Sequence, residues 1–222
     1  MIMEHKRITI FTGHYGSGKT NIAVAYAKYL RSEGKQVTVA DMDIVNPYFR
    51  TKDSMEDFKS LGIGFVSSAY ANTNVDLPAL PSELYGVMED RETCAVLDIG
   101  GDDRGACALG RFTPMIKDEN DYENLFVANM YRPLTRTPRE ALEVLREIEA
   151  AGGLPVTAIV NNSNLGELTD PETVAASLEY VRELSRISGL PVKFTAARRD
   201  VAEALGGISN EFLPMDLQKK II

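Results

Sequence analysis

The sequence has little cysteine and an excess of acidic over basic residues, and each shortage argues against a class of protein. Its two cysteines, Cys94 and Cys107, form no Cys-x-x-Cys or Cys-x-Cys pair, so we expect two free, buried thiols in a reducing cytosol. A metal or cluster shared across a dimer is the alternative for them. The 32 acidic and 24 basic residues give a net charge of −8, which argues against nucleic acid or an anionic membrane as partner, because both attract a basic face.

Long apolar runs are missing as well. No run approaches the ~20 residues of a membrane span, and the first residues, MIMEHKRITIF, are too short and too charged for a signal peptide. We therefore expect a cytoplasmic protein. The length of 222 residues fits one sizeable α/β domain. Since no linker or repeat interrupts the chain, we predict a single nucleotide-binding domain over residues 1–222.

What the chain does have is an alternation of short apolar runs and longer helical patterns. Apolar strands separated by helices predict a mostly parallel sheet with helices on both faces. Residues 43–80 are polar and glycine-rich, and we expect mobile loops there apart from one short strand. The predicted strands are 7–12, 36–40, 62–68, 94–99, 124–130, 155–162 and 191–197, and the predicted helices are 19–34, 80–92, 137–153 and 170–189.

The stretch FTGHYGSGKTN, residues 11–21, contains Gly-x-x-x-x-Gly-Lys-Thr between a predicted strand and a predicted helix. That context predicts a phosphate-binding loop, in which backbone N–H groups and the helix N-terminus surround an anion. Lys19 is expected to reach the β- and γ-phosphates and the Thr20 hydroxyl to bind Mg²⁺. The predicted nucleotide-binding residues of this stretch are Gly13, His14, Tyr15, Gly16, Ser17, Gly18, Lys19, Thr20 and Asn21.

Carboxylates follow two of the predicted strands. Asp41 and Asp43 end one strand, and Asp98 ends another and is followed by Gly101 in an Asp-x-x-Gly arrangement. Of the two, we favour Asp43 as the site residue because it comes later in the chain and lies nearer the loop. We predict Lys19, Asp43 and Asp98 as catalytic residues, and Thr20, Asp43 and Asp98 as the Mg²⁺ site. The alternative for each aspartate is a cap or a turn.

In this order, the loop, the Asp-x-Asp and the Asp-x-x-Gly resemble the MinD/ParA/CobQ-CobB nucleotide-binding family of SIMIBI-class P-loop ATPases. The resemblance implies a three-layer α/β P-loop NTPase fold with a mostly parallel seven- or eight-stranded sheet. It implies ATP, ADP as product, Mg²⁺ and a nucleotide-dependent homodimer that acts on a client protein, which the sequence does not identify. Asp43 would polarise the attacking water, and Asp98 would hold Mg²⁺ through water.

Further stretches match the family less specifically. Asn161 and Asn162 stand where the family often places an asparagine that reads the adenine edge, although a turn pair is the alternative. NPYFRTKD (46–53) stands at the first switch, where it could dock a client or simply pack under the sheet edge. ARRDVAEALGG (197–207) resembles the loop and helix that lean on the base. For the tail from Phe212 we expect docking on the body rather than a membrane anchor.

One departure from the family is clear. His14 occupies the place of the signature lysine, which reaches across the dimer, and Tyr15 replaces a glycine. We therefore expect a different arm to couple nucleotide and partner, either within NPYFR or from an arginine after Asp98. One of the arginines that follow the site-side strands could touch the γ-phosphate or a partner, although each is more often a solvated surface residue or part of a salt bridge at the rim. They are Arg104, Arg111, Arg132, Arg136 and Arg139.

The function expected from these features is a Mg²⁺-dependent ATPase that serves as a nucleotide switch or as a maturation or loading factor for a partner. The alternative is a small-molecule ATP-dependent ligase or kinase of the dethiobiotin synthetase or cobyrinic acid synthase type. Such a ligase needs a lysine shortly after the second strand, and the first lysine there is Lys52, well downstream. A module that binds ATP without hydrolysing it is the third possibility.

Overall fold

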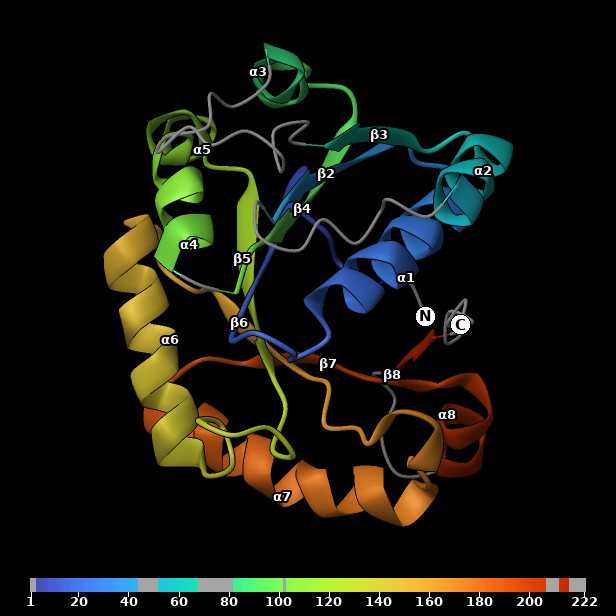
Figure 1. Ribbon diagram of the computed structural model, residues 1–222, viewed down its shortest axis with the longest axis vertical. Coiled ribbons are helices and arrows are strands. Elements are labelled where there is room, and N and C mark those ends of the chain that lie inside the picture. Colours follow the sequence, from blue (N-terminus) through green and yellow to red (C-terminus); the bar gives the residue numbers. More distant parts are fainter. Residues whose placement is uncertain (1–2, 44–51, 68–81, 102, 207–211, 216–222) are drawn as a thin grey trace.

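The chain forms one eight-stranded sheet in which every pair of neighbouring strands is parallel, in the order β3-β2-β4-β1-β5-β6-β7-β8 (Figure 1). The structure, a computed structural model, describes residues 3–43, 52–67, 82–101, 103–206 and 212–215. The predicted α/β P-loop NTPase fold with a mostly parallel sheet is thus confirmed, and the sheet has eight strands. The strands are β1 Ile8–Thr12, β2 Val37–Met42, β3 Gly64–Ser67, β4 Cys94–Ile99, β5 Tyr122–Ala128, β6 Ala158–Asn161, β7 Val192–Arg198 and β8 Phe212–Met215.

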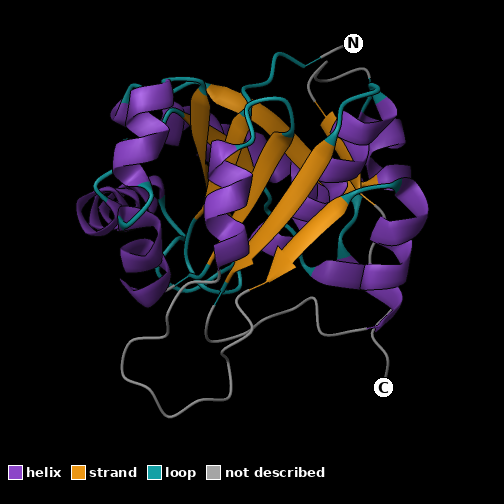
Figure 2. Ribbon diagram, turned by 90° about the horizontal axis from the view of Figure 1, so that it is seen from above, coloured by secondary structure: helices purple, strands orange, loops and turns teal. Residues whose placement is uncertain are grey.

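Helices cover both faces of the sheet and make it the middle of three layers (Figure 2). On one face, α1 and Phe58 of α2 pack on the strands. On the other face lie α3 to α7, in two adjoining apolar clusters. The helices are α1 Lys19–Ser32, α2 Lys52–Leu61, α3 Ser82–Glu89, α4 Asp103–Gly110, α5 Thr113–Glu119, α6 Pro138–Gly152, α7 Pro171–Ser188 and α8 Arg199–Leu205, with a short 3₁₀ turn at Gly166–Leu168.

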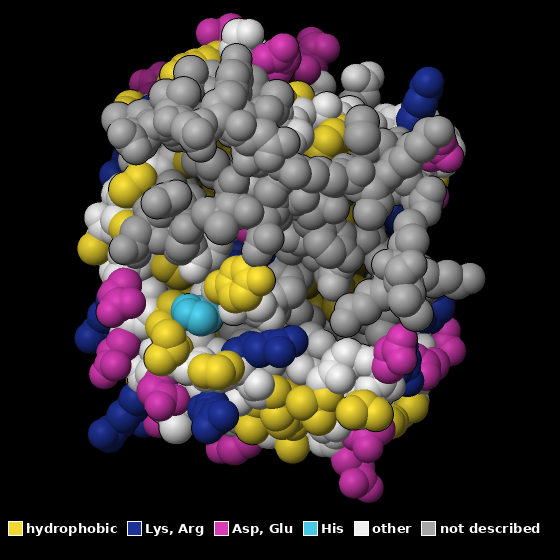
Figure 3. Space-filling view, viewed as in Figure 1, with side chains coloured by type: hydrophobic (Ala, Val, Ile, Leu, Met, Phe, Trp, Pro, Cys, Tyr) yellow, Lys and Arg dark blue, Asp and Glu magenta, His cyan; other side chains and the backbone are white. Residues whose placement is uncertain are grey.

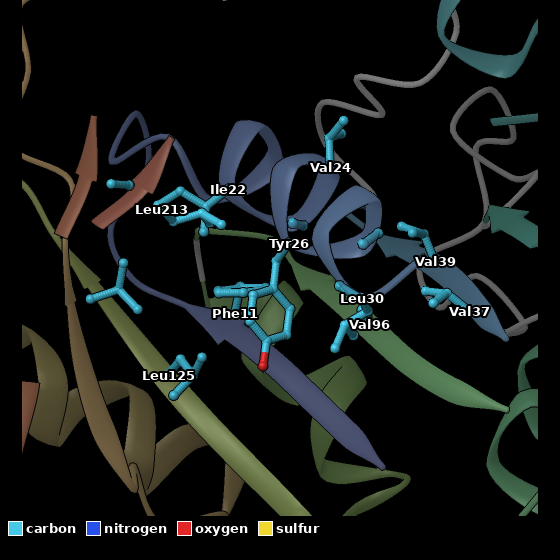
Figure 4. Close-up of a cluster of buried hydrophobic side chains, with 14 of the residues drawn as sticks. Phe11, Ile22, Val24, Tyr26, Leu30, Val37, Val39, Val96, Leu125 and Leu213 are labelled. Carbon is cyan, nitrogen blue, oxygen red and sulfur yellow. The ribbon is translucent and has the colours of Figure 1, made fainter. Parts of the chain in front are cut away.

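The core under α1 explains why the central strands are apolar throughout. All residues of β1 and β4 are buried, as expected for parallel strands with helices on both faces. Tyr26 of α1 meets Phe11 of β1 edge to face, with ring centroids 5.6 Å apart, and Leu30 lies beside Val96 (Figure 4). This packing fixes α1 over β1, and so fixes the turn that joins them.

A buried polar network ties α1 to the amino ends of the central strands. Glu123 of β5 accepts hydrogen bonds from Thr9 Oγ1 and Tyr26 Oη, both at 3.0 Å, and its other oxygen lies 2.7 Å from Lys193 Nζ. Burial, and then the charge of Glu123, raises the pKa of Tyr26 far above its ordinary value, so the phenol stays a donor. The network lies at the amino ends of the strands, whereas the predicted loop follows the carboxyl end of β1.

Several predicted elements are confirmed and others were missed. The helix at 137–153 has its predicted Thr137 cap, completed by Glu140 as a capping box, and Asp170 caps α7. The loop prediction for 43–80 was wrong for Lys52–Leu61, which is helix α2, while 44–51 and 68–81 lie outside the described residues. Helices α4 and α5 and strand β8 were not predicted. Both cysteines are free thiols, and Cys94 is buried as expected, whereas the expected burial of Cys107 was wrong, because its side chain is exposed. Of the tail, Phe212–Met215 docks beside β7, as expected, and 216–222 are not described. In the described part of the chain, no helix is long and apolar enough to cross a membrane.

Candidate phosphate-binding site

The predicted loop lies where the strand order diverges. From β1 the chain crosses over β4 to reach β2, whereas β5 and the later strands add on the other side of β1. In open parallel sheets, the carboxyl ends of strands at such a point leave a crevice in which ligands bind. The segment that joins β1 to α1 therefore stands at the expected position for a ligand site (Figure 1).

The loop backbone needs glycine at three positions, and neither His14 nor Tyr15 occupies one of them. Gly13, Gly16 and Gly18 have φ angles of 144°, 76° and 90°, whereas among the described non-glycine residues only Asn120 and Leu134 have positive φ. The side chain of Tyr15 is 62% exposed, and His14 Nδ1 lies 2.9 Å from the Tyr15 carbonyl oxygen. The two bulky residues thus fit the loop because their side chains lie at its outer surface.

Neighbouring strand ends pack directly against the loop. A methyl group added at Gly13 would lie 2.7 Å from the Val127 carbonyl oxygen of β5, and one at Gly18 would overlap the Asn162 amide nitrogen. A methyl group at Gly101, after β4, would lie 2.6 Å from Tyr15 N and 2.9 Å from Lys19 Nζ. These approaches leave no room for larger residues, so β4, β5 and β6 together hold the loop in shape.

The first turn of α1 is built to receive an anion. Gly18 at its N-cap supplies no side-chain acceptor, and the first turn carries no acidic residue. The N–H groups of a helix start lack intrahelical partners, and the helix dipole favours negative charge there. Lys19 is buried, and its Nζ donates to Gly13 O at 2.9 Å and to His14 O at 3.2 Å. Its ammonium group is thereby held over the loop.

The structure brings Thr20 and Asp98 into direct contact. Thr20 Oγ1 donates a hydrogen bond of 2.6 Å to Asp98 Oδ2. Burial raises the pKa of Asp98 to about 6, while the Thr20 hydrogen bond and the charge of Lys19 lower it and the charge of Asp43 raises it. A buried carboxylate beside a hydroxyl is a donor set suited to Mg²⁺, which prefers oxygen ligands.

Asp41 and Asp43 both reach this edge of the sheet, in different ways. Asp41 is buried in β2 and lies in register with Asp98 on β4. Asp43 follows β2, is half-buried, and its backbone N–H donates to Asp41 Oδ1 at 3.0 Å. The choice of Asp43 over Asp41 as the functional carboxylate stays a prediction, and the register adds Asp41 to the carboxylates beside Asp98.

The two predicted asparagines face different neighbours. Asn162 Nδ2 donates to the Ser17 carbonyl oxygen at 2.7 Å, so this side chain contacts the loop. Asn161 Nδ2 instead donates to Ser177 Oγ of α7 at 2.8 Å, and its Oδ1 accepts from Ser163 N. The structure therefore brings Asn162 to the site, whereas both polar ends of Asn161 are engaged with α7 and with the loop after β6.

Buried polar atoms without a partner gather around this loop. Such atoms are uncommon in folded proteins and call for a ligand, water or ion. In the described part of the chain they include Ser17 Oγ, Asn21 Oδ1, Asp98 Oδ1, Asn129 Nδ2 and Asn162 Oδ1. The sequence analysis missed Asn129, although it directly follows the buried strand β5, much as Asp98 lies at the end of β4. Their placement indicates a site for a polar ligand.

Solved structures share this fold. FtsY from the chloroplast of Physcomitrella patens matches with a TM-score of 0.59 and 17% identity, covering 86% of this chain and 58% of that one. FtsY from Thermotoga maritima matches with 0.55 and 18%, covering 89% and 63%. FlhF complexed with GTP and Mg²⁺ matches with 0.56 and 14%, covering 86% and 66%. No protein-family profile and no curated protein sequence matches the chain.

At these identities the likeness shows the fold alone. The chain has an α/β P-loop NTPase-like fold like that of FtsY and FlhF, and it spans about three fifths of the length of the two FtsY chains. The MinD/ParA/CobQ-CobB subfamily and the meaning of the missing signature lysine stay predictions. The first-switch segment lies mostly in 44–51, outside the described residues.

Proposed function

We propose that this protein binds Mg²⁺-ATP at the loop after β1 and hydrolyses it to ADP and phosphate. The observation that carries the proposal is the meeting of Lys19, Thr20 and Asp98 at an uncapped helix start. Each is the residue type that the chemistry requires at its position. The partnerless buried polar atoms around the loop support a polar ligand there.

In this proposal the phosphates take over bonds that the loop now makes to itself. Lys19 Nζ exchanges the Gly13 and His14 carbonyl oxygens for phosphate oxygens, and the N–H groups of the α1 first turn complete the anion site. Thr20 Oγ1 and Asp98 exchange their mutual hydrogen bond for Mg²⁺ and its water. The metal would neutralise charge on the phosphates, and Asp43 would orient the attacking water.

ATP rather than GTP is the proposed nucleotide. The Asn162 amide nitrogen donates a hydrogen bond to the backbone oxygen of Ser17. Its Oδ1 remains an acceptor without a partner among the described residues. An acceptor there suits the exocyclic amino group of adenine, whereas guanine presents a carbonyl oxygen at the equivalent position. FlhF, which shares the fold, was solved with GTP, so the choice of base must be measured directly.

We further propose that the nucleotide state controls a homodimer and, through it, a client protein. Gly101, two positions past the end of β4, packs against Tyr15 and Lys19 of the loop. A γ-phosphate that takes Lys19 Nζ would disturb this contact and shift the segment after β4. Such a shift would give a partner a way to sense the nucleotide.

The test is phosphate release by the purified protein with ATP or GTP as sole substrate. We expect Mg²⁺-dependent release from ATP that is lost in Lys19→Ala and reduced in Asp43→Ala. Release only when a second small substrate is added would favour a ligase or kinase instead. Tight ATP binding without release, alone or with co-purifying partners, would favour a sensor. Light scattering with and without ATP tests the dimer.

A further inference from the structure

A second basic side chain lies at the phosphate-binding loop, and it comes from a different strand. A methyl group added at Gly16 would lie 4.0 Å from Arg132 Nε. Gly16 is exposed and has φ 76°, and Arg132 belongs to the segment that follows β5, the strand beside β1. The guanidinium group thus reaches the middle of the loop from across the end of the sheet.

The segment that carries Arg132 is held by hydrogen bonds on both sides. Asn129 O accepts from Arg132 N at 3.2 Å and from Thr135 Oγ1 at 2.7 Å. Tyr131 Oη donates a hydrogen bond to the backbone oxygen of Thr173 in α7, and Tyr180 Oη, also in α7, donates one to the backbone oxygen of Thr135. A turn fixed in this way presents Arg132 from a defined backbone rather than from a loose loop.

The backbone of the turn that carries Arg132 also has an unusual conformation, at Leu134. Leu134 has φ 60° and is 59% exposed. A leucine in the left-handed region is uncommon. Such strain persists where the surroundings impose it, and it tends to occur at functional sites. Removing this strain is therefore expected to change where the turn places Arg132.

The charge of Arg132 is not neutralised within the described part of the chain, where no carboxylate lies within ion-pair distance of it. Some other arginines there are paired, such as Arg186 with Glu183 and Arg198 with Asp200, and what distinguishes Arg132 among the unpaired ones is its place beside the loop. Figure 3 shows basic, histidine and hydrophobic side chains next to one another on one face of the molecule. An arginine beside a phosphate-binding loop, without a carboxylate partner, is suited to bind phosphate, because its fork of N–H groups matches phosphate oxygens.

We propose that Arg132 contacts the phosphate chain of the bound nucleotide and supplies, from within the same subunit, a second positive charge beside that of Lys19. The assignment rests on the proposed nucleotide site. It makes Arg132 a phosphate-binding residue that cooperates with Lys19. Of the candidates expected for the additional arm, it selects one arginine after Asp98 rather than the first switch.

The experiment compares Arg132→Ala, Arg132→Lys and the matched control Arg136→Ala, an exposed arginine four residues further on. Affinity is measured by calorimetry for Mg²⁺-ATP and by competition for inorganic tripolyphosphate, which has no base or ribose. Hydrogen bonds to charged groups contribute about 1.5–3 kcal/mol, so Arg132→Ala is expected to weaken both ligands about 10- to 100-fold. Arg132→Lys should recover part of the loss, and Arg136→Ala should bind like the wild type.

Three results would overturn the assignment. The first is ATP affinity in Arg132→Ala within twofold of the wild type, which leaves the proposed function standing. The second is a loss for ATP with no loss for tripolyphosphate, which would place Arg132 on the base or ribose. The third is an equal loss in Arg136→Ala, which would indicate general electrostatic attraction. A wild-type protein that binds neither ligand overturns the proposed function and this assignment together.

Discussion

The hydroxyl of Thr20 donates a hydrogen bond of 2.6 Å to Asp98 Oδ2, and this bond joins the first turn of α1 to the end of β4. Asp98 is buried and its second oxygen has no partner among the described residues. The hydrogen bond thus holds two elements together, while burial of Asp98 disfavours the charged form of its carboxylate. Its behaviour with pH and with ligand follows from that combination.

Replacing Asp98 should make the ligand-free protein more stable above pH 6. Its pKa of about 6 in the folded protein exceeds the value of about 3.9 for an unfolded chain. The folded state therefore binds the proton more tightly, and the stabilisation by that proton is complete below pH 4 and lost as pH rises through 6. At one pKa unit per 1.36 kcal/mol, Asp98→Asn should gain roughly 2 kcal/mol over the wild type on going from pH 4 to pH 7.5.

Urea denaturation of both proteins at several pH values, without nucleotide, measures this difference. Taking the difference between the two proteins cancels the titration of the other carboxylates. A difference that stays constant from pH 4 to 7.5 would contradict the raised pKa of Asp98.

Lys19→Ala should abolish most turnover while leaving the fold intact. Lys19 is buried over the loop, with its charge beside the proposed phosphates. Removal of one preorganised donor typically lowers kcat by about 10²- to 10³-fold. Lys28→Ala, in the same helix but exposed and paired with Asp57, is the matched control and should keep wild-type phosphate release. Comparable losses in both variants would mean that the effect is not local to the loop.

Gly18→Ala should cost more stability than Gly34→Ala. Both glycines have left-handed φ angles, 90° and 82°, but a methyl group at Gly18 overlaps the Asn162 amide whereas one at Gly34 meets nothing within 4 Å. Backbone strain costs about 1–3 kcal/mol in each variant, and only Gly18→Ala adds the steric overlap. Denaturant melts of the two variants and of Gly18→Ala combined with Asn162→Ala separate the terms. If the double variant kept all of the additional loss of stability that Gly18→Ala shows relative to Gly34→Ala, the loss would not come from overlap with Asn162.

Tyr26→Phe should lower stability without affecting the nucleotide site. It leaves Glu123 with Thr9 and Lys193 but removes one hydrogen bond to a buried carboxylate. The expected loss is about 1.5–3 kcal/mol in the free energy of unfolding. The network lies at the amino ends of the strands, whereas the loop lies at their carboxyl ends. ATP affinity, measured at a temperature where the variant is folded, should therefore stay within twofold of the wild type. A larger change would mean that the two ends of the sheet are coupled.

The parts of the site that follow from the sequence are those encoded within one segment. Gly13 to Thr20 form a loop between a strand and a helix because glycines stand where φ is positive and the flanking residues are apolar at strand and helix spacing. Asp98 is placed by the same logic, since it lies near the end of a buried strand. These local signals were sufficient to predict the contact of the loop with β4.

Relationships between segments were not available from the sequence. The pairing of Asp41 with Asp98 depends on strand register, and the approach of Arg132 to Gly16 depends on which strand lies beside β1. Helices α4 and α5 were missed because Gly105, Gly110 and Pro114 interrupt their apolar periodicity. Strand β8 has four residues and forms by pairing with β7, so its own sequence gives little sign of it.

The most direct test of the account is a calorimetric titration of ATP with Mg²⁺ into the wild-type protein and into Lys19→Ala. We predict one ATP bound per chain, no measurable binding to Lys19→Ala, and weaker binding of GTP than of ATP. Wild-type protein that binds neither nucleotide, or a Lys19→Ala variant that binds ATP with unchanged affinity, would contradict the assignment of the loop after β1 as the nucleotide site.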